Sequence, residues 1–353
     1  MFKRQSIIMI IFLLLLSGCG LGKEKLVINE RVATIKQLVA IEDSRFTMQI
    51  PEGWVYETVG DFQNFGLRAY DPDNPHRSIF YYGTMSPWLK SEQAKSFWTW
   101  YAQSGYPQAQ MYADAPVLYD ASVEGLYYSF NIFTYFAQAY GIVHNFYQFN
   151  EFDVVEQFST STAMATYALD ESTLRLNMKD NNGYPIEALV TATIVDAMSY
   201  PANGIDAGYY TAYRVSGIIA PADDMIYHEE LLTQALGSFS YKLEYIDQGV
   251  ELIEWGTEQA LQMQQTLNET SQIIHDTWAY RDKVVDSTNA EFISYIRGKG
   301  YLQDPDSGEI FEADQSFVDD YLKDPNQYNR TNLVPLEAGA PGYGQPVTGV
   351  IGN

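Results

Sequence analysis

The chain has 353 residues, of which 46% are hydrophobic and 15% aromatic, so it can bury enough apolar surface to fold over most of its length. Its 45 acidic and 21 basic residues give a net charge of −24, which argues against a nucleic-acid-binding protein because such proteins need a cationic face. A single cysteine excludes an internal disulfide framework and a cysteine-rich zinc site.

The amino terminus has the pattern of a secretory signal. Lys3 and Arg4 form a short cationic region, and residues 7–16 are an unbroken apolar run. This run is too short to span a bilayer, since a membrane helix takes about 20 apolar residues. Its length and its basic flank are instead typical of a signal peptide.

The segment Leu16-Ser17-Gly18-Cys19 resembles the lipobox of bacterial lipoproteins. The resemblance implies cleavage after Gly18, loss of residues 1–18 as a lipoprotein signal peptide, and a diacylglyceryl thioether on Cys19. Acyl chains contribute about 0.8 kcal/mol per buried CH₂, so they would anchor the protein to the extracytoplasmic face of the cell membrane. Residues 19–40 would then form a tether. The alternative is an ordinary signal peptide with an unmodified cysteine.

Residues 41–245 predict one α+β domain, because strands follow one another in hairpins while helices are segregated at the ends. Helices are predicted for residues 91–103, with Ser91 as the N-cap, and for residues 223–236. The sequence Asn181-Asn182-Gly183 predicts a hairpin turn. The predicted strands cover residues 46–50, 78–84, 126–136, 142–149, 172–178, 187–196 and 209–219.

Two short stretches of this domain resemble the PsbP/Mog1-like fold. Phe46 to Trp54 (FTMQIPEGW) looks like its opening strand and turn, and Ala235 to Phe239 (ALGSF) looks like its closing element. The resemblance covers residues 40–242. It implies an antiparallel sheet flanked by helices in an α/β/α sandwich. It implies no catalytic residues, because these folds mostly serve as binding and assembly modules.

Residues 246–335 predict a long helix followed by a small β-hairpin unit. Apolar residues at helical intervals place the helix over residues 251–286. The strands predicted after it cover residues 293–302, 309–312 and 321–332. Residues 336–353 are rich in Gly, Pro and Ala and predict a flexible tail.

The sequence contains no HExxH, GxSxG, P-loop or dinucleotide-binding motif, and we expect neither a metal nor another cofactor. The four histidines are not spaced as ligands on one helical face, and we expect them to be isolated: His76, His144, His228 and His275. Asp71-Pro72-Asp73-Asn74 and Asp304-Pro305-Asp306-Ser307-Gly308 resemble fragments of calcium loops but lack further ligands. Such segments are also typical of tight turns, which we expect here.

Aromatic residues are the most unusual feature of the composition, with 28 Tyr, 18 Phe and 6 Trp. Flat rings can stack on a sugar or a peptide, and the candidate ligand surface consists of Trp98, Trp100, Tyr101, Tyr127 and Tyr128. The alternative is that these rings fill the core, which is the commoner role of such residues. At i and i+3, Trp98 and Tyr101 share a helix face, whereas Trp100 lies off that face and can be exposed.

Two functions from different classes fit these features. The first is a membrane-anchored, non-catalytic binding or assembly module of the cell envelope, with an unidentified envelope protein or ligand as its partner. The second is an extracytoplasmic hydrolase that acts on envelope polymers through a carboxylate pair. Its candidate acids are Glu187, Asp196 and Asp206, which lie near the ends of predicted strands. The absence of a catalytic motif in the sequence favours the first function.

Overall fold

A computed structural model describes residues 23–30, 37–141, 146–159, 163–251, 298–337, 340 and 347–352. The chain divides into two compact units. The smaller unit combines residues 1–32 with residues 290–353, and the larger unit comprises residues 33–289. Both units contain helices and antiparallel strands, so the mixed α+β class predicted from the sequence is confirmed.

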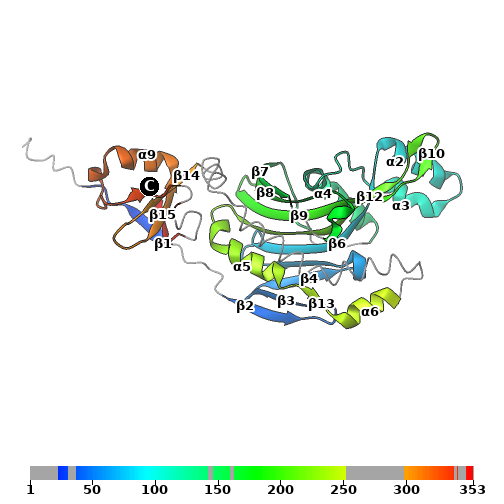
Figure 1. Cartoon of the computed structure of the whole chain (residues 1–353), viewed down its shortest axis with the longest axis horizontal. Coiled ribbons are helices and arrows are strands. Elements are labelled where there is room, and N and C mark those ends of the chain that lie inside the picture. The colour runs from blue at the N-terminus through cyan, green and yellow to red at the C-terminus, as the bar shows by residue number, and fades with distance from the viewer. Residues whose placement is uncertain are drawn as a thin grey trace, which may run out of the picture. The chain divides into compact units, whose positions relative to one another are not determined.

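A seven-stranded antiparallel sheet forms the centre of the larger unit, in the order β4-β5-β6-β12-β9-β8-β7 (Figure 1). Its strands are β4 (Val55–Val59), β5 (Gly66–Tyr70), β6 (Ser78–Leu89), β7 (Phe152–Ser159), β8 (Ala168–Lys179), β9 (Pro185–Met198) and β12 (Tyr209–Pro221). The inner strands β6, β12 and β9 are buried along most of their length, so both faces of the sheet must be covered.

Two hydrophobic cores lie on opposite faces of this sheet. On one face, helix α4 (Val123–Ala139) packs in the same cluster as Phe80. On the other face, helix α5 (Met225–Gly237) and strand β3 (Phe46–Pro51) pack in the same cluster as Tyr81. Phe80 and Tyr81 are neighbours in β6 but enter different cores, because successive side chains of a strand point to opposite faces.

A second, three-stranded sheet, β13-β3-β2, adds its apolar side chains to the core beneath α5. Its other strands are β2 (Leu38–Glu42) and β13 (Ser240–Tyr241), and helix α6 (Leu243–Glu251) follows β13. The turn predicted after β3 is present. Gly53 has a φ of +84° there, a conformation that glycine adopts without a steric penalty.

The predicted hairpin turn Asn181-Asn182-Gly183 connects β8 and β9. The Asp180 carboxylate accepts hydrogen bonds from the backbone N–H groups of Asn182 at 2.8 Å and Tyr184 at 2.7 Å. Gly183 takes the left-handed conformation with a φ of +82°. The turn is therefore formed by the residue types that the sequence pattern requires.

Helices α2 and α3 and the small hairpin β10–β11 gather at one end of the long strands (Figure 1). Their bounds are α2 (Glu92–Gln103), α3 (Gln110–Asp114), β10 (Pro201–Ala202) and β11 (Ile205–Asp206). Ser91 is the N-cap of α2, as predicted, and its hydroxyl accepts a hydrogen bond from the Ala94 N–H at 3.1 Å. The cap sets the start of the helix and thereby the direction of every side chain on it.

Residues 126–136, predicted as a strand, form the middle of helix α4, so that prediction was wrong. The Ser122 hydroxyl caps this helix by accepting a hydrogen bond from the Gly125 N–H at 3.0 Å. The core-facing residues recur at helical spacing: Leu126, Phe130, Phe133 and Ala137. The prediction followed the β-propensity of the aromatic residues, and packing of one helix face against the sheet overrides that propensity.

The described residues of the smaller unit form a five-stranded sheet, β1-β17-β15-β14-β16, and helix α9 around a core of their own. Its elements are β1 (Val27–Glu30), β14 (Lys299–Gln303), β15 (Ile310–Asp314), α9 (Gln315–Lys323), β16 (Val334–Pro335) and β17 (Gly349–Gly352). The predicted hairpin is confirmed as the antiparallel pair β14–β15, whereas β15 and β17 run parallel.

Three predictions for this unit need correction. Strand β1 lies within residues 19–40, predicted as a tether, and β17 lies within residues 336–353, predicted as a flexible tail. The two strands pair antiparallel, with Val27 opposite Gly352, so each gains its backbone partners from the far end of the chain. The strand predicted over residues 321–332 is instead the end of α9 followed by a short 3₁₀ turn.

Some predicted features lie outside the described residues. They are the signal peptide 1–18 with Gly18, the lipidation residue Cys19, nearly all of the helix 251–286, and residues 142–145 and 293–297. The remainder of the strand predicted over 142–149 has no regular secondary structure. Among the residues that the structure describes, none of the helices combines the length and the apolar character that a membrane span needs.

Candidate functional site

Helix α2 carries five consecutive residues, Phe97-Trp98-Thr99-Trp100-Tyr101, that the helix divides between core and solvent. Trp98 is buried, and its indole N–H donates a hydrogen bond to the Ala207 carbonyl at 2.8 Å. Trp100, two positions later, is 58% exposed. The helical spacing predicted this separation, and it means that Trp98 fixes the helix while Trp100 projects into solvent.

Further rings form a stack beside Trp100. Tyr101 lies between Phe97, at 5.9 Å between ring centroids and 11° between planes, and Tyr106, at 4.2 Å and 2°. Tyr200, just before β10, reaches Phe97 at 5.7 Å. We call these five residues, Phe97, Trp100, Tyr101, Tyr106 and Tyr200, the α2 aromatic surface. Because its rings hold one another in place, the surface is ordered before any ligand binds.

The structure does not bring all five predicted ligand-surface residues together. Trp98, Trp100 and Tyr101 lie on α2, where Trp98 is the buried support. Tyr127 lies on α4 and is fully buried, and its hydroxyl donates a hydrogen bond to the Thr191 carbonyl at 3.1 Å. Tyr127 is therefore a core residue, which was the alternative reading.

Tyr128 is 56% exposed, almost as much as Trp100, but it lies on α4 rather than on α2. Its ring stacks on Phe152 at 4.2 Å, and its hydroxyl donates a hydrogen bond to the Phe152 carbonyl at 3.3 Å. Phe152 begins β7, the edge strand of the large sheet. Tyr128 therefore has a separate packing role and offers a matched comparison with Trp100.

Two carboxylates border the α2 aromatic surface. The Lys90 ammonium lies 2.6 Å from an Asp196 oxygen and 2.7 Å from an Asp206 oxygen. The ammonium lies inside, since the Lys90 side chain is 9% exposed, while the side chains of Asp196 and Asp206 are 44% and 38% exposed. The carboxylate of Asp206 also accepts a hydrogen bond from the Tyr200 N–H at 2.7 Å, which joins the acid directly to the ring surface.

The charge state of Asp206 follows from these contacts. The hydrogen bond from Lys90 is the main cause that holds the pKa of Asp206 far below its usual range, and the N–H groups of Tyr200 and Gly208 add to it. A general acid for glycoside hydrolysis needs a raised pKa, which is the opposite direction. The arrangement suits a permanent negative charge at the surface.

The third candidate acid, Glu187, is in a different place. It is fully buried and forms an ion pair with Arg175, which also meets Glu156 at 3.1 Å and Glu229 at 3.0 Å. Glu187 therefore belongs to a buried charge cluster beside α5. The structure places Asp196 and Asp206 together through Lys90 but does not add Glu187 to them.

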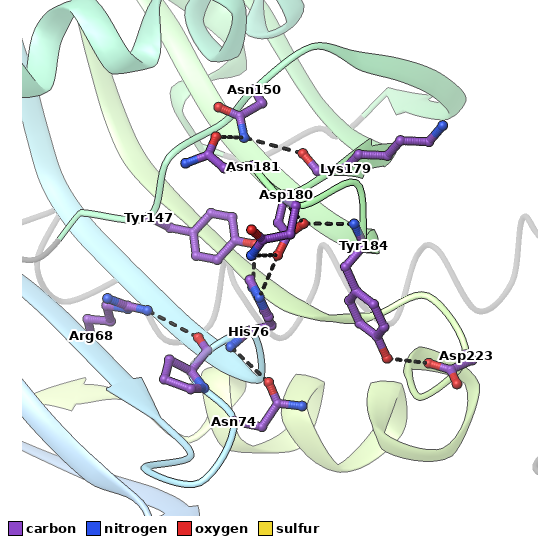
Figure 2. A network of polar contacts seen from close by, with 12 residues as sticks. Arg68, Asn74, His76, Tyr147, Asn150, Lys179, Asp180, Asn181, Tyr184 and Asp223 are labelled. Atoms are coloured by element: carbon purple, nitrogen blue, oxygen red, sulfur yellow. Dashed lines mark hydrogen bonds and ion pairs between the residues drawn. The ribbon is translucent and has the colours of Figure 1, made fainter.

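A polar network that the sequence did not predict occupies the other end of the large sheet (Figure 2). The His76 Nε2 atom lies 3.3 Å from an Asp180 oxygen, and its Nδ1 atom lies 3.2 Å from the Tyr147 hydroxyl. Backbone N–H groups of Tyr184 and Asn182 lower the pKa of Asp180, whereas burial raises the pKa of Tyr147. The imidazole thus bridges an ionised carboxylate and a protonated phenol.

This network connects three segments that are far apart in the sequence. His76 comes from the loop before β6, Asp180 from the β8–β9 turn, and Tyr147 from the segment before β7. The His76 ring stacks on Tyr184, whose hydroxyl donates to an Asp223 oxygen at 3.5 Å (Figure 2). We had expected isolated histidines, and no spacing signal could have shown that these partners meet.

The other histidine that the structure describes is His228. His228 is buried on α5, and burial lowers its pKa. His144 and His275 lie outside the described residues. Within the described part of the chain, no group of three or more His, Cys, Asp or Glu side chains is arranged to hold a metal ion.

Both segments that resemble calcium loops are turns. The Asp71 carboxylate accepts a hydrogen bond from the Asp73 N–H at 2.9 Å and pairs with Arg77 at 3.1 Å. In the smaller unit, the side-chain amide of Asn332 donates to Asp304 at 3.0 Å and to Asp306 at 2.9 Å. The oxygens that calcium would need are thus engaged by the protein's own donors.

No protein-family model and no curated protein matches this chain. Among solved structures, the chain is similar to the solution structure of cyanobacterial PsbP (CyanoP) from Synechocystis sp. PCC 6803, with 11% identity and a TM-score of 0.25 over 60% of this chain and 95% of that one. It is also similar to a crystal structure from Bacteroides thetaiotaomicron VPI-5482, with 11% identity and a TM-score of 0.21 over 72% of this chain and 77% of that one. At these TM-scores and identities, neither similarity carries an argument about the fold or the function of this chain.

Proposed function

We propose that this chain is a lipid-anchored lipoprotein on the extracytoplasmic face of the cell membrane, where it acts as a non-catalytic binding or assembly module. The lipobox-like segment before Cys19 supports the anchor, with cleavage after Gly18 and acylation of the only thiol in the chain. The net charge of −24 supports a body that stays off an anionic lipid surface and does not bind nucleic acid.

The binding surface in this proposal is the α2 aromatic surface. The observation that carries it is that Trp100 is 58% exposed while its neighbours Phe97, Tyr101 and Tyr106 are already stacked. Exposed apolar groups mark interaction sites where they are contiguous, and Trp100 contacts the rings of Phe97 and Tyr101. An ordered platform also loses little conformational entropy when a ligand binds.

The fold in this proposal is an α/β/α sandwich of the PsbP/Mog1-like kind. Its support is the packing of α4 and α5 in two separate cores on opposite faces of the seven-stranded sheet. Such a body has a rigid centre, and its α2 aromatic surface lies at one end of the sheet, clear of both cores. The arrangement suits a module that presents a surface rather than one that encloses a substrate.

The binding role is tested by a photo-reactive amino acid placed at Trp100 in the full chain and expressed in cells. We expect illumination to produce a discrete crosslinked species from this position and none from Tyr128, which has the same exposure but a different place. Equal crosslinking from both positions, or none from either, contradicts a specific surface on α2.

The anchor is tested separately by metabolic labelling with a fatty acid analogue. Cys19→Ala should abolish the label and leave the protein uncleaved or released from the membrane. An unlabelled native protein, or a labelled Cys19→Ala variant, contradicts the anchor and leaves the crosslinking result to be judged alone.

A further inference from the structure

We infer that the α2 aromatic surface binds an extended cationic segment of a partner polypeptide, whose arginine or lysine side chains lie over Trp100 and Tyr106 and pair with Asp196 and Asp206. This inference rests on the proposed binding function and adds the chemistry of the ligand to it. It follows from the charges around the surface, from the ring faces that are open, and from the distribution of both along the site.

The charges around the surface are unequal. Residues 90–141 and 195–213, which contain α2, α3, α4 and the β10–β11 hairpin, hold six acidic residues, two lysines and no arginine. Both lysines are engaged: Lys90 pairs with two carboxylates, and the Lys95 ammonium donates to the Ala115 carbonyl at 3.1 Å. The acidic residues outnumber the lysines, and the side chains of Asp196 and Asp206 are more exposed than that of Lys90, so the negative charge is the one nearer to an approaching ligand, which favours a cation.

The ring stack determines where a cation can lie. Phe97 and Tyr106 both stack nearly parallel to Tyr101, so Tyr101 is a support. Trp100 contacts Phe97 and Tyr101 at 6.2 and 6.4 Å with tilted planes and remains 58% exposed, which leaves the indole open. A guanidinium group over an indole ring is the most favourable of the protein cation–π pairs.

The positions of the rings and acids favour an extended ligand over a single small cation. The rings form a row of contacts in which Tyr106 meets Tyr101, Tyr101 meets Phe97, and Phe97 meets Tyr200. The Tyr200 N–H donates to the Asp206 carboxylate, so Tyr106 and Asp206 are at opposite ends of this row. A single small cation would contact only one end of it. A segment with several cationic side chains can contact both, and each contact adds to its affinity.

The test measures binding of a fluorescein-labelled hexa-arginine peptide to the full chain in a non-ionic detergent, by fluorescence anisotropy. Hexa-glutamate and the neutral glycan cellohexaose serve as the comparison ligands. Cellohexaose is tested both as a competitor of the labelled peptide and directly, by calorimetry. We expect hexa-arginine alone to bind, and to bind more weakly when the salt concentration rises from about 50 to about 500 mM.

Variants separate this site from the general negative charge of the protein. Trp100→Ala should weaken binding about tenfold, and Asp196→Asn should weaken it about threefold. The matched controls Tyr128→Ala, another exposed ring, and Asp73→Asn, an exposed acid at the other end of the sheet, should leave the affinity unchanged. Circular dichroism of each variant confirms that the fold is retained.

Three results would overturn the inference. If Trp100→Ala binds hexa-arginine as tightly as Tyr128→Ala does, the peptide recognises net charge and not this surface. If cellohexaose binds in a Trp100-dependent way and hexa-arginine does not, the ligand is a neutral glycan, and the proposed binding function stands without the cationic partner. If no ligand binds and the photo-reactive group at Trp100 forms no crosslink, both the inference and the proposed function are wrong.

Discussion

The two ends of the large sheet differ in what their polar and aromatic side chains contact. At the His76 end, loops before β6, after β8 and after β12 turn their charged side chains toward one another. At the α2 end, an ammonium group lies inside, two carboxylates face solvent, and an indole ring is left open. At the first end the charged side chains hold the loops together, whereas at the second end carboxylates and an indole ring are available to a partner.

This difference shows that residue types common in catalytic sites are a poor guide to a binding site. A histidine, an aspartate and a tyrosine in contact form the more suggestive combination, yet His76, Asp180 and Tyr147 each bind their own neighbours. The α2 aromatic surface contains no such combination, yet Trp100 is 58% exposed and the side chains of Asp196 and Asp206 face solvent. Ring faces and charged groups that stay exposed to solvent are the better criterion for a binding site.

The largest expected effect separates the support from the surface at the α2 end. Trp98→Ala removes a buried ring and its hydrogen bond to Ala207 and should lower the free energy of unfolding by about 3–5 kcal/mol. Trp100→Ala should change it by no more than about 0.5 kcal/mol, because the ring is mostly in water. Denaturation followed by tryptophan fluorescence reports on the larger unit, which holds all six tryptophans. A large loss from Trp100→Ala would mean that this ring is structural.

Glycine substitutions compare the backbones of the two ends. A Cβ atom at Gly208, before β12, would lie 1.8 Å from the Met198 carbonyl oxygen, so Gly208→Ala should destabilise the larger unit by about 2–3 kcal/mol. A Cβ atom at Gly183, in the β8–β9 turn, meets no atom within 4 Å, and its cost is only the left-handed φ, about 1 kcal/mol. The same denaturation assay measures the loss of stability in both variants. Equal losses would show that the backbone around Gly208 can shift to make room for the Cβ atom.

His76→Ala should lower the free energy of unfolding by about 1 kcal/mol, because it removes contacts with Asp180 and Tyr147 that are half-buried. Tyr147→Phe, which removes only the hydroxyl contact, should cost less. Neither variant should change the affinity for hexa-arginine. A loss of that affinity in His76→Ala would show that the two ends of the sheet are coupled and do not act separately.

Low pH should reduce the stability that both ends contribute to the fold, and it should reduce the contribution of the α2 end more. Asp206 and Asp180 have folded-state pKa values below the usual aspartate value, so each contributes stability above about pH 4 that is lost as the pH falls through its folded pKa. Lys90 shifts the pKa of Asp206 much further. Asp206→Asn should therefore flatten the acid side of the stability profile more than Asp180→Asn does, as measured by unfolding midpoints between pH 6 and pH 2.

Local signals predicted the elements whose pattern is complete within a short stretch of sequence. Ser91 and the apolar spacing after it located α2, and Asn181-Asn182-Gly183 located the β8–β9 hairpin, because caps and turns depend on adjacent residues. The same reasoning placed Trp100 in solvent. It failed at residues 126–136, where aromatic residues fit either a strand or a helix and only the facing sheet decides.

Features that depend on distant partners were not predictable in this way. Nothing near His76 in the sequence indicates Asp180 or Tyr147, and nothing near Trp98 indicates the Ala207 carbonyl. Asp196 and Asp206 were singled out for their position near strand ends, but their shared partner Lys90 comes from the end of β6. For Asp206 this partner lowers the pKa, which is the opposite of the raised pKa that a catalytic acid needs.

The pairing of β1 with β17 makes the order of synthesis matter. The smaller unit contains both the first and the last described strand of the chain, and the larger unit is inserted between them. The larger unit can fold as soon as it emerges, but β1 must wait until β17 has been synthesised before its backbone groups are paired. A nascent chain that does not yet include β17 therefore exposes β1 as an unpaired strand, and proteolysis between β15 and β17 would remove the covalent link that brings β17 to β1.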